Sequence, residues 1–361
     1  MGRVTGAEQL RDLELGRGAA ADIMDPPPAP GSPAGILERR SDGSSSADSP
    51  RRVRRGIPAV DLAFQVLFTA AGLVLLIIVF AIVAILVSQS ELSFRTFGFR
   101  YLIDTRWDFK NQIYGVVPFV AGTLITSGIA LLIGLPLALG SAIFLTAQAP
   151  AVLRGPLATA VELLAAIPSV VYGFWGLYVL APYMRTTVEP ALQHYLGFTG
   201  AFNGTATGTD VLTAGVILAV MIVPTISAIS RETLAAVPAS QREAALSLGA
   251  TSWETTRVAS LPYARAGIFG ATILGLGRAL GETMAVTMTI GNRDQVPTSL
   301  LSQGQSITSL FANELTSNNG PIQYSAIIEA GLILILISLA VNVLARFLLW
   351  RVLAIRGSPT R

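Results

Sequence analysis

The sequence predicts an all-α polytopic membrane protein with about six transmembrane helices. Of its 361 residues, 52% are hydrophobic and only 13% are charged, whereas about 25% charged residues are typical of a soluble domain. Long segments without any charged residue recur along the chain, and each is close to or above the ~20 residues that a helix needs to cross a bilayer. The chain contains no cysteine, which excludes disulfides, thiolate metal sites and a cysteine nucleophile.

Four of the expected spans are uncharged, and two contain charged residues. The uncharged segments are residues 62–87, 116–148, 163–184 and 211–230. The fifth segment, about 266–290, contains Arg278 and Glu282, and the sixth covers about 325–349 and ends near Arg346. Charged residues inside a span are costly and usually face a bundle interior or a watery path. The fifth segment is therefore the first place to look for function.

Pro168 is expected to kink the third segment. Two polar residues follow it, Ser169 and Tyr172. They could line a transport path, but polar side chains near a proline kink equally often satisfy the carbonyl groups that the kink frees.

The two ends of the chain differ in composition from the segment between them. Residues 1–56 are rich in Gly, Ala, Ser, Pro and Asp, without apolar periodicity, and end in the basic run 51–55. This composition predicts a disordered tail. The permease domain then covers 57–356, followed by a short tail at 357–361. Arginine and lysine are in excess in the segments on the side of the N-terminus, which predicts that both termini are cytoplasmic.

The connection between the fourth and fifth spans, about 231–265, is patterned. Ser240 and Glu243 have the spacing of a capping box, and Gly249 would end the helix that they begin. Thr251 and Glu254 repeat the spacing. The segment therefore predicts two short helices around a glycine turn, either as an ordinary interfacial hairpin or as a docking element.

A proline is expected to end the second of these helices. Pro262 follows Leu261 directly, and a proline inside a helix removes a hydrogen bond.

The same segment resembles the "EAA" signature of ABC importer membrane subunits, E-A-A-x3-G-x9-I-x-L-P. The matching residues are Glu243, Ala244, Ala245, Gly249, Leu261 and Pro262. Ala259 replaces the usual isoleucine. The resemblance implies type I ABC importer permease architecture, and a coupling helix that docks onto an ATP-hydrolysing subunit.

Arg278 and Glu282 admit two interpretations. Residues four apart share a helix face, so the two can form a structural ion pair. Alternatively, Arg278 presents its planar fork of donors to a transported oxyanion, and Glu282 pairs with Arg278 when the transport path holds no anion.

Two further stretches narrow the resemblance to one family. "ELLAAIPSVVYGFWGL" and "GLGRALGETMAVTMTIGN" are similar to segments of the PstC-type membrane subunit of phosphate-specific ABC importers. The likeness covers about residues 57–356. It implies that Arg278 and Glu282 lie on a phosphate path, and that the chain resides in the bacterial cytoplasmic membrane. The implied partners are a PstA-like second permease subunit, two copies of an ABC ATPase and an extracytoplasmic phosphate-binding protein.

The chain itself has no nucleotide-binding motif. No G-x-x-x-x-G-K-[ST] segment occurs, so ATP and Mg are expected on the partner ATPase, with no cofactor on this chain. Membrane lipid is an expected partner, and nucleic acid is not, because the basic residues form no stripe.

The competing hypothesis is a gradient-driven secondary anion transporter or channel, with Glu282 as the proton-coupling carboxylate. No nucleophile or metal constellation favours an enzyme.

Overall fold

The computed structural model describes residues 59–317 and 320–354. The chain divides into two compact units, Met1–Phe64 and Gln65–Arg361, and nearly all the elements below belong to the second. The predicted tail at 1–56, with its basic run 51–55, and the C-terminal tail at 357–361 lie outside the described residues.

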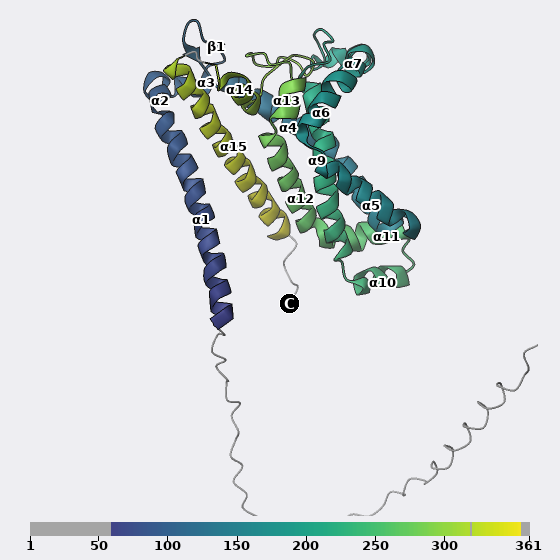
Figure 1. The fold of residues 1–361 in the computed structure, drawn as a ribbon. Coiled ribbons are helices and arrows are strands. Elements are labelled where there is room, and N and C mark those ends of the chain that lie inside the picture. Colours follow the sequence, from purple (N-terminus) through teal and green to yellow (C-terminus); the bar gives the residue numbers. More distant parts are fainter. Residues whose placement is uncertain (1–58, 318–319, 355–361) are drawn as a thin grey trace, which may run out of the picture. The chain divides into compact units, whose positions relative to one another are not determined.

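The described chain is predominantly helical (Figure 1). The long helices are α1 (Ala59–Gln89), α4 (Val117–Ile143), α5 (Ala151–Ala166), α9 (Val211–Ala235), α12 (Leu261–Gly281) and α15 (Pro321–Ala354). The shorter helices are α2 (Glu91–Phe97), α3 (Arg100–Ile103), α6 (Ser169–Trp175), α7 (Ala181–Tyr183), α8 (Glu189–Leu196), α10 (Ala239–Ser247), α11 (Ser252–Thr255), α13 (Met284–Thr289) and α14 (Ile307–Glu314). The π-helical turns are η1 (Phe144–Gln148), η2 (Gly176–Leu180), η3 (Met184–Val188) and η5 (Thr256–Ser260), and η4 (Gly197–Thr199) is a 3-10 turn. Strands β1 (Trp107–Asp108) and β2 (Ile113–Tyr114) pair antiparallel.

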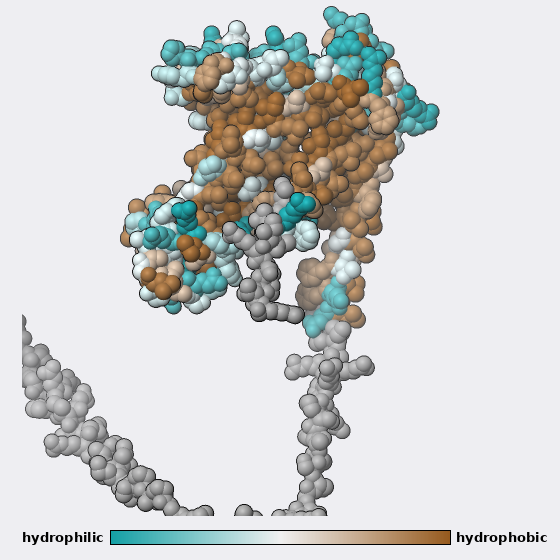
Figure 2. Space-filling view, turned by 180° about the vertical axis from the view of Figure 1, so that it is seen from behind, coloured by the Kyte–Doolittle hydropathy of each residue, from teal (hydrophilic) through white to brown (hydrophobic). Residues whose placement is uncertain are grey.

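The expected all-α membrane fold is confirmed, whereas the count of six spans is not. Within residues 59–317 and 320–354, four helical segments are long and apolar enough to cross a bilayer: Asp61–Gln89, Val117–Gln148, Val211–Ala235 and Pro321–Arg351. The bent pair Ala151–Ala166 and Ser169–Thr199 makes a fifth if it is one span. A hydrophobic band crosses the molecule below a polar end (Figure 2). The predicted segment at 266–290 is divided between α12 and α13, because the first helix ends at Gly281.

The kink expected at Pro168 is present as a sharp bend. α5 ends at Ala166, Ile167 is extended, and the two helical segments meet at 93°. The residue before a proline disfavours the α conformation, which explains the break at Ile167. The Tyr172 hydroxyl donates to the carbonyl oxygen of Leu164 at 2.8 Å. Tyr172 thus satisfies a carbonyl group at the bend, the second of the two roles considered for it.

Helices α4, α9 and α12 pack together around the largest buried cluster. Its members are Ala130, Ala138, Val211, Ala214, Leu218, Ile222, Ile226, Ala271, Ala279, Val286 and Ile290. Small residues let these helices approach closely. At Gly275, for example, an added Cβ would lie 2.6 Å from the Cδ1 atom of Ile226. This three-helix core holds the elements that carry Arg278.

A second cluster lies at the end of the bundle opposite α10 and α11 (Figure 1). It is aromatic: the ring centroids of Trp107 and Phe119 are 4.9 Å apart, edge to face. The Trp107 indole Nε1 donates to Oε2 of Glu314 at 3.1 Å. The hydroxyl of Tyr101 donates to the carbonyl oxygen of Ala326 at 2.6 Å. These contacts join β1, α3, α14 and α15 into a cap over the helix ends.

Candidate functional site

A cavity of about 940 Å³ lies between α9, α12 and α15. Its lining residues are Thr225 from α9, then Gly270, Ile273, Leu274, Gly277 and Arg278 from α12, and Leu339, Asn342, Val343, Arg346 and Leu349 from α15. The polar groups among them are two guanidinium groups, an amide and a hydroxyl. No lining residue is acidic, so the cavity can attract an anion.

Arg278 enters this cavity without an acidic partner. Its Nη1 donates to the Thr225 hydroxyl oxygen at 3.1 Å, and the side chain is half-buried. The ion pairs found within residues 59–317 and 320–354 do not include Arg278. A guanidinium group has five N–H donors, so Arg278 keeps donors for a bound oxyanion.

The expectation that Arg278 and Glu282 face each other on one helix is wrong. α12 ends at Gly281, and Glu282 is extended, with ψ of 128°. Its Oε1 accepts from the backbone N–H of Ala285 at 3.4 Å, and its carbonyl oxygen accepts from the Thr308 hydroxyl at 2.7 Å. Glu282 therefore satisfies backbone groups at the break between α12 and α13, and also ties this break to α14.

The connection at about 231–265, called the coupling segment below, forms two short helices around a glycine turn, as expected. Gly249 has φ of +85°, a conformation that glycine adopts at little cost. The capping box at the start of α11 is confirmed, because Thr251 and Glu254 each accept from the other's backbone N–H. The one expected at Ser240 and Glu243 is wrong: α10 already begins at Ala239, directly after Pro238, which has no side-chain cap.

Pro262 does not end the second helix, contrary to expectation. The chain continues from α11 through the π-helical turn η5 into α12, and Pro262 lies in the first turn of α12. A proline is tolerated where its missing N–H is not needed. The wider π-helical turn before it shifts the hydrogen-bond pattern at this point. The coupling segment is thereby joined to the Arg278 helix without an intervening loop.

The surface of the coupling segment exposes large apolar side chains. Leu248 is 90% exposed. Leu246, Trp253 and Val258 are also exposed. Of the signature residues, Glu243 and Ala244 are exposed and Ala245 is half-buried. The coupling segment thus presents both apolar side chains and the signature residue Glu243 on its surface.

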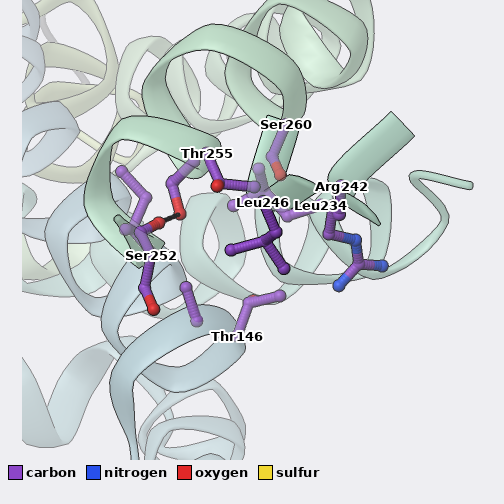
Figure 3. Close-up of a pocket in the computed structure, with 10 residues that line it drawn as sticks. Thr146, Leu234, Arg242, Leu246, Ser252, Thr255 and Ser260 are labelled. Carbon is purple, nitrogen blue, oxygen red and sulfur yellow. Dashed lines mark hydrogen bonds between the residues drawn. The ribbon is translucent and has the colours of Figure 1, made fainter. Parts of the chain in front are cut away.

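Polar contacts connect the coupling segment to the long helices. Beneath it is a pocket of about 170 Å³, where Leu246 lies among the lining side chains and the Arg242 guanidinium group points away from Ser252 (Figure 3). Arg242 Nη2 donates to the carbonyl oxygen of Val237 at 2.8 Å, just beyond the end of α9. Arg231 of α9 in turn pairs with Glu162 of α5. These contacts tie α10 to the end of α9, and α9 to α5.

Three polar lining residues of the cavity were not singled out as a site from the sequence. Thr225 lies in the middle of an apolar span, with no signal that sets it apart. Asn342 and Arg346 are four residues apart in the last span, a spacing that places both on one helix face and could have been noticed. Ser169 and Tyr172, which were candidates for lining a path, do not line this cavity.

Comparison with known proteins gives consistent matches. Residues 130–353 match the family model described as "Binding-protein-dependent transport system inner membrane component". The chain is 41% identical over 308 residues to the "Phosphate transport system permease protein PstC" of Mesorhizobium japonicum, covering 84% of this chain and 94% of the relative. It is 43% identical over 297 residues to the protein of that name from Pasteurella multocida, covering 81% and 92%. A Mycobacterium tuberculosis relative, "PstC 2", is 36% identical over 304 residues, covering 82% and 92%.

Proposed function

Since the chain belongs to the family of PstC-type membrane subunits of phosphate ABC transporters, we propose that it forms half of the translocation pathway of an ATP-driven phosphate importer. The other half would come from a PstA-like permease subunit. Phosphate would be delivered by an extracytoplasmic binding protein and would leave into the cytoplasm of a bacterium.

The observation that carries this proposal is the donor-lined cavity around Arg278. Its guanidinium group contacts only the Thr225 hydroxyl among the hydrogen bonds of the described chain, in a cavity without an acidic lining residue. Phosphate is well matched to a guanidinium fork, which can donate two parallel hydrogen bonds to it. The cavity of about 940 Å³ around Arg278 is much larger than the ion, which favours a weak and transient site and suits an ion that must also be released.

ATP would act on this path through the coupling segment. We expect the exposed patch around Leu248 to dock onto an ATPase subunit, with Glu243 at its rim, while ATP and Mg are bound by that subunit and no cofactor is bound by this chain. Closure of two ATPase copies would push α10. The Arg242 contact with Val237 and the continuous path from α11 into α12 would carry the push to α9 and to the Arg278 helix.

The same scheme sets the orientation in the membrane. The coupling segment must face the cytoplasm to meet the ATPase. Because α15 returns to that end of the bundle (Figure 1), the C-terminus would then be cytoplasmic. The excess of arginine and lysine in the segments on the side of the N-terminus favours the same side for that terminus, in a multi-pass protein of the bacterial cytoplasmic membrane.

A gradient-driven anion transporter is the second candidate function. It requires a carboxylate that takes up and releases protons, for which Glu282 is the candidate in the fifth predicted span. The hydrogen bonds of Glu282 to Ala285 and Thr308 favour a structural role for it at the helix break. This observation makes the ATP-driven importer the better supported reading.

The test is phosphate uptake into vesicles that contain the complete complex, its binding protein and internal ATP. Arg278→Gln should abolish uptake while assembly and ATP hydrolysis persist, because it removes the donor fork and little of the packing. Glu243→Ala should lower uptake and transport-linked ATP hydrolysis together, because it acts on docking. Uptake that needs no ATP and follows a proton gradient, with Glu282→Gln as the inactive variant, would replace the importer by the secondary transporter.

A further inference from the structure

We propose that Arg346 and Asn342 of α15 form a second oxyanion site in the cavity that Arg278 lines. This proposal rests on the proposed function, because it names a further station for the same phosphate ion. Both side chains line the cavity of about 940 Å³, and residues four apart lie on one face of a helix. Arg278 would hold the ion first, and the Arg346 site would receive it on the way to the coupling-segment end.

The charge of the cavity favours an anion. Arg346, like Arg278, has no ion pair among residues 59–317 and 320–354. Two guanidinium groups therefore share one cavity between α9, α12 and α15 without a carboxylate among its lining residues. Two like charges in one cavity repel each other when no counter-charge is present. A phosphate ion would neutralise them, and the amide of Asn342 could add N–H donors beside those of Arg346.

The two arginines lie at different depths along the cavity. α12 leads away from the coupling segment and α15 returns to the same end, so the helices run antiparallel (Figure 1). On α12, Arg278 is the lining residue farthest from the coupling segment. On α15, the lining residues extend from Leu339 to Leu349, a length of about 15 Å at 1.5 Å per residue. Arg346 is near the coupling-segment end of that face. The cavity is longer than one phosphate ion, which leaves room for two successive sites.

Two glycines in the wall of the cavity border open space. Gly270 and Gly277 of α12 both line the cavity, and a Cβ added at either would meet no atom within 4 Å. Within this chain they thus leave space and do not serve close helix packing. Two weak sites in an open groove let an ion enter and leave more easily than one tight site does.

Thiol labelling tests the site directly, because the chain has no cysteine of its own. Val343 lines the cavity and is 58% exposed, whereas the adjacent Leu344 is 59% exposed and does not line it. Val343→Cys therefore places a thiol beside Arg346 and leaves both proposed ligands intact, and Leu344→Cys is the matched control. The complete complex, in phosphatidylcholine nanodiscs, is treated with a negatively charged and with a neutral methanethiosulfonate reagent.

The proposal predicts three results for the Val343→Cys variant. Adding Arg346→Gln lowers the rate at which the negatively charged reagent labels the thiol about fivefold or more, the factor expected for one unit charge about 4 Å away in water. The labelling rate of the neutral reagent stays the same. Adding Arg346→Lys keeps most of the rate. Inorganic phosphate slows the charged reagent at Val343→Cys and not at Leu344→Cys.

Two labelling outcomes would overturn the proposal. Equal reactivity with and without Arg346 would mean that this arginine only holds the end of α15 at the membrane surface. Protection by added phosphatidylglycerol in phosphate-free buffer, without protection by inorganic phosphate, would identify a lipid headgroup as the ligand instead.

Phosphate uptake by variants of Arg278 and Arg346 shows whether only the second site is wrong or the proposed function as a whole. Arg346→Gln should lower ATP-driven phosphate uptake about tenfold, a change of about 1.4 kcal/mol, with assembly intact. Arg351→Gln, an exposed arginine of the same helix that does not line the cavity, should leave uptake unchanged. If Arg278→Gln abolishes uptake and Arg346→Gln does not lower it, only the second site is wrong. If neither variant lowers uptake, the proposed function itself is wrong.

Discussion

Gly122→Ala should detach the loop between α13 and α14 from α4. A Cβ at Gly122 would lie 2.1 Å from the carbonyl oxygen of Gln305 and 2.9 Å from its carbonyl carbon, so the loop backbone must move by about 1 Å or more. That backbone is held in place: the N–H of Ile307 donates to the Thr123 hydroxyl at 3.0 Å. Overpacking of this kind costs about 1–3 kcal/mol, and a glycine-to-alanine change in a helix returns up to about 1 kcal/mol. We expect a net loss of about 1–2 kcal/mol.

Thermal unfolding of the purified complex measures this loss, with Gly128→Ala as the control. Gly128 lies in the same helix, and a Cβ there would meet no atom within 4 Å, so only the favourable helix-propensity effect remains. Gly122→Ala should unfold several degrees below the wild type, and Gly128→Ala at or above it. If the two variants unfold at the same temperature, the close approach of the loop to α4 does not exist, and the reasoning is refuted.

Three further predictions concern hydrogen bonds and charge. Tyr172→Phe loses the hydrogen bond to Leu164 at the helix bend and should cost about 1–2 kcal/mol, read as a lower unfolding temperature; an unchanged temperature would mean that the bend needs no such support. Thr251→Ala removes one half of a capping box with Glu254 and should cost about 1 kcal/mol, seen as faster hydrogen exchange confined to α11 and η5, whereas Thr251→Ser should be close to neutral. Burial raises the pKa of Asp294 to about 6 from 3.8, with a smaller contribution from a nearby acidic side chain. The protonated carboxyl therefore favours the folded state: its contribution is complete below about pH 4 and is lost as the pH rises through about 6. Asp294→Asn should accordingly raise the unfolding temperature at pH 7.5 and leave it unchanged at pH 4, and a gain of the same size at both pH values would exclude this titration.

The class of protein and the coupling segment followed from local features of the sequence. Hydropathy over about 20 residues decides whether a helix can cross a bilayer, and no distant contact changes that. The turn at Gly249 and the capping box at Thr251 also depend only on neighbouring residues. The bend at Pro168 is local for the same reason, because proline restricts the residue before it.

Tertiary structure alone decided what surrounds the charged residues. Arg278 and Glu282 have the spacing of a helical ion pair, but the helix ends between them, at Gly281, and Glu282 bonds to the backbone of Ala285 and to Thr308 instead. The partner of Arg278, Thr225, is 53 residues away in the chain.

The sequence by itself thus determined the membrane class of this chain, its family resemblance and its coupling motif. It did not determine that α9, α12 and α15 enclose one cavity in which Arg278 and Arg346 are both found. Helix-forming and membrane-spanning tendencies are sums over adjacent residues, whereas a cavity is the space left when helices far apart in the chain pack against each other.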